Sequence, residues 1–150
     1  MFPDIASTGN ILYNSVESEV SNMKLNHDCV RDLLLYLEEN LTCENKIAIH
    51  NLQLKHYTKP ELIYTADKLT EANFIKCIRK DCYDDNAVTL FAKSITYEGH
   101  QLLDTIRDDG VWKETKKIAN KVATVPIKML SEIGTKVITD IISKQMGISI

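Results

Sequence analysis

A helix followed by a β-hairpin is predicted by residues 58–95, whose sequence is TKPELIYTADKLTEANFIKCIRKDCYDDNAVTLFAKSI. Thr58 followed by Glu61 is a capping box, in which each side chain satisfies a free amide of the first helical turn. Pro60 fits that turn because the amide it lacks has no partner inside a helix. These signals predict a helix over 59–72.

A two-stranded hairpin is predicted directly after that helix. Residues 74–80 and 87–95 are rich in the β-branched and aromatic side chains that favour strands. The acidic linker 81–86 contains Asn and has a composition suited to a hairpin loop.

Two elements are predicted before this unit. Residues 26–41 repeat apolar side chains at helical spacing, and Asn26 or Asp28 is placed to cap the helix. Residues 46–54 alternate apolar and polar side chains, which predicts a strand.

Three further helices are predicted after the hairpin, over 97–108, 111–123 and 127–146. Thr96 is placed to cap the first of them. Pro126 marks the start of the last, because its ring disfavours helical geometry at the preceding residue.

The predicted order of helix, strand, helix, hairpin and helices indicates an α+β fold, a winged-helix-like domain with a helical carboxy-terminal extension. A single clear helix lies between the first strand and the hairpin, so the usual helix-turn-helix is not plainly present. We expect an acidic arm over 1–22, the winged-helix-like domain over 23–110 and a basic amphipathic extension over 111–150.

Three segments, 23–40, 57–69 and 95–112, resemble domain of unknown function 2513, an uncharacterised family of bacteria and phages. The similarity runs from about Met23 to the carboxy terminus. It implies a small winged-helix-like domain, often encoded by prophages or other mobile elements, and it brings no established catalytic residues. Asn73 stands where relatives tend to have Gly before the wing, and Asn also tolerates left-handed geometry.

Charge is distributed unevenly along the 150 residues, whose net charge is −3. Residues 1–22 carry three acids and no Lys or Arg, whereas residues 111–150 carry seven Lys and three acids. This distribution excludes a uniformly basic nucleic-acid binder and allows a local basic patch.

The sequence favours a cytoplasmic protein, and the family resemblance implies a bacterial host cell. The first residues lack a secretory signal, and no apolar run approaches the ~20 residues that span a bilayer. The four cysteines are therefore expected as thiols.

The last predicted helix has the clearest amphipathic pattern. Lys128, Glu132, Lys136, Asp140 and Lys144 alternate in sign on its back. Its apolar face either packs on the domain's own core or pairs with a second copy or another protein. The leading hypothesis is a non-enzymatic phage or mobile-element interaction protein that docks or self-associates through this face. The expected interface residues are Ile127, Leu130, Ile133, Val137 and Ile141.

The alternative hypothesis is a winged-helix nucleic-acid-binding regulator that uses the helix 59–72, the wing 74–95 and a basic patch beside a tryptophan. The competing interpretation of that patch is a solvated face with the tryptophan in the core. The residues expected to contact nucleic acid are Lys59, Trp112, Lys113, Lys116, Lys117 and Lys121.

No pattern in the sequence indicates an enzyme, a cofactor or a metal site. Cys77 and Cys82 form one loose pair, whereas a zinc site needs two closely spaced ligand pairs. The segment 97–100, Tyr-Glu-Gly-His, contains an acid and a base but no positioned partner, so a structural role in the first helical turn is expected.

Overall fold

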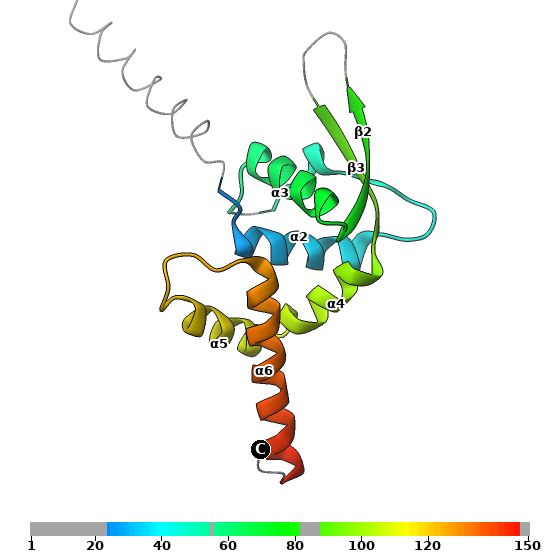
Figure 1. Cartoon of the computed structure of the whole chain (residues 1–150). Coiled ribbons are helices and arrows are strands. Elements are labelled where there is room, and N and C mark those ends of the chain that lie inside the picture. The colour runs from blue at the N-terminus through cyan, green and yellow to red at the C-terminus, as the bar shows by residue number, and fades with distance from the viewer. Residues whose placement is uncertain (1–23, 55, 82–87, 148–150) are drawn as a thin grey trace, which may run out of the picture.

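The computed structural model describes residues 24–54, 56–81 and 88–147. Within them, helices and a small antiparallel sheet form an α+β fold (Figure 1). The expected arm 1–22, most of the hairpin linker 81–86 and Cys82 lie outside the described residues. The elements in chain order are α2 (His27–Asn40), β1 (Ile47–Ala48), the 3-10 helix η1 (Ile49–Asn51), α3 (Lys59–Glu71), β2 (Ile75–Asp81), β3 (Val88–Ile95), α4 (Tyr97–Ile106), α5 (Asp109–Ala119) and α6 (Ile127–Met146).

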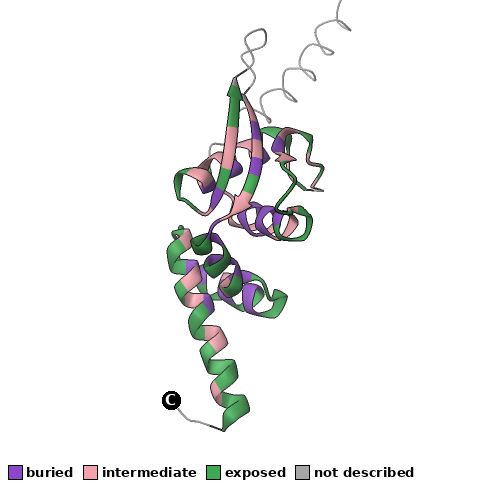
Figure 2. Cartoon of the chain, turned by 90° about the vertical axis from the view of Figure 1, so that its right-hand side faces the viewer, coloured by how far each residue is buried: buried purple, intermediate pink, exposed green. Residues whose placement is uncertain are grey.

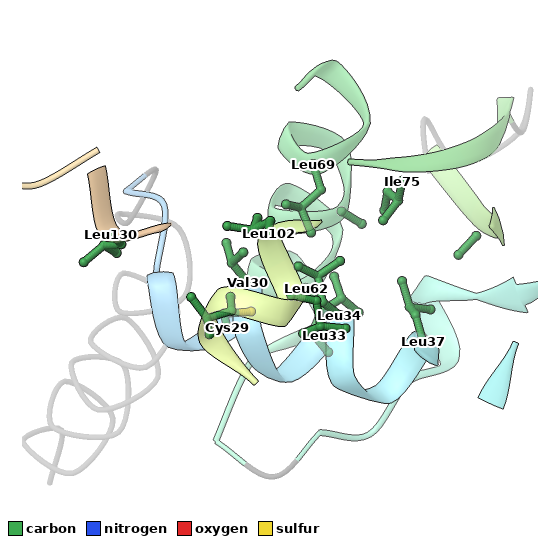
Figure 3. Close-up of a cluster of buried hydrophobic side chains, with 14 of the residues drawn as sticks. Cys29, Val30, Leu33, Leu34, Leu37, Leu62, Leu69, Ile75, Leu102 and Leu130 are labelled. Atoms are coloured by element: carbon green, nitrogen blue, oxygen red, sulfur yellow. The ribbon is translucent and has the colours of Figure 1, made fainter. Parts of the chain in front are cut away.

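Helix α2 is the central helix and begins at the expected cap. The Asn26 side chain accepts hydrogen bonds from the backbone amides of Asp28 and Cys29. Its apolar stripe is fully buried among α3, α4 and β3 (Figure 3). That stripe consists of Val30, Leu33, Leu34 and Leu37.

The strand predicted over 46–54 is wrong in length. Only Ile47 and Ala48 pair with β3, and the chain then turns into η1. This turn places Ile49 in the core, where it is fully buried beside α3. The free energy gained by burying this side chain outweighs the strand preference of the alternating pattern.

Helix α3 confirms the predicted cap and ends one residue early. Thr58 Oγ1 accepts from the Glu61 amide at 3.3 Å. The Glu61 carboxylate accepts from Asn26 Nδ2 at 3.0 Å, so it links the starts of α3 and α2 rather than closing the capping box. Asn73 follows with a φ of 63°, the left-handed geometry that Asn tolerates.

The predicted hairpin is confirmed, and β3 lies between β1 and β2 in the sheet. On β3, Leu90 and Ala92 are buried against the helices. Strands β2 and β3 project beyond the helical body at the top of Figure 1.

The start of α4 is locked onto the end of the α3–β2 turn. Thr96 Oγ1 accepts from the Gly99 amide at 3.0 Å and donates to the Asn73 carbonyl at 2.6 Å. A Cβ on Gly99 would lie 2.0 Å from the Phe74 carbonyl oxygen, so glycine is required there. The Tyr-Glu-Gly-His segment therefore holds the helix against the sheet.

Helices α5 and α6 pack on the rest of the protein. Asp108 caps α5, which ends at Ala119 instead of the expected 123. Helix α6 begins directly after Pro126, as predicted. Trp112 and Leu130 belong to the same buried cluster as α2 and α4, so one hydrophobic core runs through all of these helices.

Candidate interaction surfaces

The first half of α6 is bound to the body of the protein. A Cβ on Gly134 would lie 2.5 Å from the Thr105 carbonyl oxygen of α4. The hydroxyl groups of Thr105 and Ser131 are 3.0 Å apart and share a hydrogen bond. Gly134 thus allows a close approach between the backbones of α6 and α4.

The expected interface residues of α6 divide into two groups. Leu130 is 1% exposed and lies in the protein's own core, so it cannot form part of a surface in this conformation. Ile127, Ile133 and Val137 are partly buried, whereas Ile141 is 48% exposed. The surface therefore shifts from the expected stripe toward the end of the helix.

The second half of α6 extends past the rest of the protein (Figures 1 and 2). Ile142 is 51% exposed and Met146 is 66% exposed. These side chains continue the apolar face beyond the point where α4 and α5 cover it. Contiguous exposed apolar surface is typical of protein interaction sites, so this end of α6 is a candidate surface.

A groove of about 430 Å³ lies beside this face, between α5 and α6. Ile118 of α5 lines one side and is 38% exposed. The α6 side combines apolar and charged groups, namely Met129, Glu132, Ile133, Lys136, Val137 and Asp140.

The tryptophan of the expected nucleic-acid patch is buried. Trp112 is 7% exposed, and its Nε1 donates to Asp28 Oδ1 at 2.9 Å. Lys116 Nζ lies 2.6 Å from Asp28 Oδ2. Trp112 therefore packs in the core rather than stacking on a base, and Lys116 is engaged within the chain.

Asp28 is held as a carboxylate by these contacts. Its partial burial acts to raise its pKa, but the hydrogen bonds from Lys116 and Trp112, together with the positive charges of Lys116 and Arg31, keep the pKa below the ordinary value. The site ties α2 to α5, a role that no local sequence pattern indicates.

The remaining expected lysines do not gather on one surface. Lys113, Lys117 and Lys121 are exposed on or just after α5, whereas Lys59 lies at the start of α3. In Figure 1 the hairpin lies at the top of the protein, whereas α5 lies below α2 beside the first half of α6.

The described cysteines and acids do not form a metal centre. Among residues 24–54, 56–81 and 88–147, no three His, Cys, Asp or Glu side chains are grouped to hold a metal ion. Cys77 is partly buried, and burial raises the pKa of its thiol.

These features define a small α+β domain with an apolar helix that projects from its body. The chain belongs to the family described as hypothetical protein DUF2513, whose model matches residues 24–126. The matched region ends at Pro126, directly before α6. An uncharacterized protein of Haemophilus influenzae strain Rd is 27% identical over 122 residues, covering 81% of this chain and 100% of that protein. No solved structure matches the chain.

None of the described helices is both long and apolar enough to cross a membrane.

Proposed function

We propose that this protein acts by binding rather than by catalysis, and that it self-associates through the second half of α6. The observation that carries this proposal is the exposure of Ile141, Ile142 and Met146 on a helix whose first half is firmly packed. The packed half holds the helix in place, so the exposed half is presented without first having to fold.

A second copy of the same helix is the occupant that fits this face best. An antiparallel pair related by a two-fold axis brings the same patch together from both copies. One such register sets Ile138 against Ile141 and Val137 against Ile142. The alternating charges on the back of α6 include both signs, so two copies do not repel through a uniform field.

The element order and the sheet order β1-β3-β2 support a winged-helix-like assignment for the rest of the protein. In that assignment η1 and the loop after it stand where a helix-turn-helix has its first helix. We propose that this body is a scaffold that presents α6 and the hairpin at opposite ends, as expected of a phage or mobile-element interaction protein.

Light scattering on the full chain tests self-association. We expect twice the chain mass of 17.1 kDa for the natural sequence and 17.1 kDa for Ile141→Asp with Ile142→Asp. The control Lys121→Glu, in the loop before α6, changes the net charge by the same −2 and should leave the doubled mass intact.

Circular dichroism should show the same helix content for all three proteins, because the replaced side chains are exposed. If the mass of the natural protein stays at 17.1 kDa at high micromolar concentration, the proposal is overturned.

A further inference from the structure

The outward face of the sheet carries an aromatic ring among lysines. Because side chains alternate along a strand, the burial of Leu90 and Ala92 places Phe91 on the opposite face. Phe91 pairs there with Ile78 across the strands. Lys80 Nζ lies 5.5 Å from the centre of the Phe91 ring, which confirms that the two share this face.

Two exposed lysines, Lys76 and Lys80, share this face with Phe91 and are not neutralised by described residues. Both alternate with Ile78 along β2, whereas the register shift opposite Lys76 and Cys77 interrupts the alternation on β3 at Lys93. Neither Lys76 nor Lys80 forms an ion pair within the part of the chain that the structure describes.

We infer that this face, with Lys76 and Lys80 beside Phe91, binds single-stranded nucleic acid. Proteins bind single strands by combining cations along the phosphate backbone with aromatic rings on which bases stack. Lys76 and Lys80 are four residues apart on a strand, about 13 Å, so one backbone can contact both while a base reaches the ring between them. Lys80 must move aside for that base, which an exposed lysine does at little cost.

The chemistry of the hairpin favours a single strand over the other polyanions. The sequence from the end of β2 to the start of β3 includes three aspartates, Asp81, Asp84 and Asp85, whose negative charge disfavours approach to the phosphates that line the groove of a duplex. In a duplex the bases are already stacked on each other and cannot reach Phe91. An acidic peptide would satisfy the lysines but supplies no base for the ring.

This inference does not depend on self-association. The hairpin projects from one end of the protein and the second half of α6 from the other (Figures 1 and 2). A strand bound to the sheet therefore leaves α6 free, and each site can be removed without the other.

Fluorescence anisotropy of the full chain with a short labelled single-stranded DNA of mixed sequence tests the site. We expect Lys76→Glu with Lys80→Glu to weaken binding by about tenfold or more and to reduce the slope of log affinity against log salt by ~1.4, at ~0.7 per lost phosphate contact. The matched control, Lys113→Glu with Lys117→Glu on α5, takes the net charge from −3 to the same −7. It should weaken binding less than about twofold.

Phe91→Leu separates stacking from charge, because it keeps an apolar side chain at that position. It should weaken single-strand binding several-fold without changing the salt slope. Absence of binding at low salt would overturn the inference, as would equal loss from both lysine pairs. Tighter binding of the matching duplex, or equal binding of poly-glutamate, would overturn the choice of a single strand.

Discussion

The Trp112 indole donates a hydrogen bond to the Asp28 carboxylate at 2.9 Å and thereby joins α5 to the start of α2. Lys116 holds the second carboxylate oxygen at 2.6 Å, and its Nζ lies 5.7 Å from the centre of the Trp112 ring. Trp112 and Lys116, which were expected to contact nucleic acid, thus belong to a packing site.

Replacing Asp28 by Asn should destabilise the protein, because a neutral amide cannot match the charged hydrogen bond to Lys116. We expect a loss of about 1–2 kcal/mol in the free energy of unfolding near neutral pH, measured by urea denaturation. The control Asp104→Asn removes an exposed pair with Arg107 and should cost less than about 1 kcal/mol.

The contribution of Asp28 to the free energy of unfolding should also depend on pH. Its pKa is lower in the folded protein than its ordinary value of 3.8, so its contribution is present above 3.8 and is lost as pH falls through the folded pKa. The difference between the natural protein and Asp28→Asn should therefore shrink at acidic pH. A difference that stays constant down to the lowest pH at which both proteins fold would contradict this assignment.

Replacing Gly134 by Ala should destabilise the protein even though Ala favours helices. The added Cβ would lie 2.5 Å from the Thr105 carbonyl oxygen, so α6 must shift from α4. We expect a loss of about 1–3 kcal/mol despite a gain of up to ~1 kcal/mol in helix propensity. The control Thr139→Ala, at an exposed position of the same helix, should change stability by less than about 0.5 kcal/mol. A Gly134→Ala protein more stable than the natural one would show that the two helices are not in close contact.

Much of the fold could be predicted from the sequence because its signals are local. The caps at Asn26, Thr58 and Thr96 each satisfy amides within three residues, so their helices begin where expected. The strand over 46–54 failed because Ile49 is drawn into a core formed by distant elements. A local pattern carries no information about such contacts.

The surfaces were harder to predict than the elements that carry them. Sequence periodicity places Leu130 and Ile141 on one stripe of α6, but it does not show where α4 and α5 stop covering that stripe. The lysines of the sheet were missed for a similar reason. Their shared face with Phe91 depends on the register between β2 and β3.

Because the first half of α6 is packed and the second half is exposed, two similar substitutions in this helix should differ in how much stability they cost. Leu130→Ala should cost about 2–5 kcal/mol, because it empties part of a packed core. Ile141→Ala should cost less than about 1 kcal/mol in the monomer, since that side chain is already half exposed. Urea denaturation at low protein concentration checks both values. Equal costs would mean that the second half of α6 folds back onto the body.

Cys29 and Cys43 should differ strongly in their reaction with a thiol reagent. Cys29 is fully buried, its sulfur accepts a hydrogen bond from Thr65, and burial raises the pKa of its thiol to about 11. Cys43 is exposed in the loop before β1. Because the thiolate is the reactive form, we expect iodoacetamide to label Cys43 rapidly near pH 8 while Cys29 stays protected, as read by peptide mass spectrometry.

The urea-unfolded protein provides the control for this experiment, because burial is then lost and both peptides should be labelled at similar rates. Thr65→Val would keep the packing around Cys29 but remove the hydrogen bond to its sulfur. Protection should persist in that variant, since burial is the main cause of the raised pKa. Labelling of Cys29 as fast as Cys43 in the native protein would show that the contact between α2 and α3 opens readily.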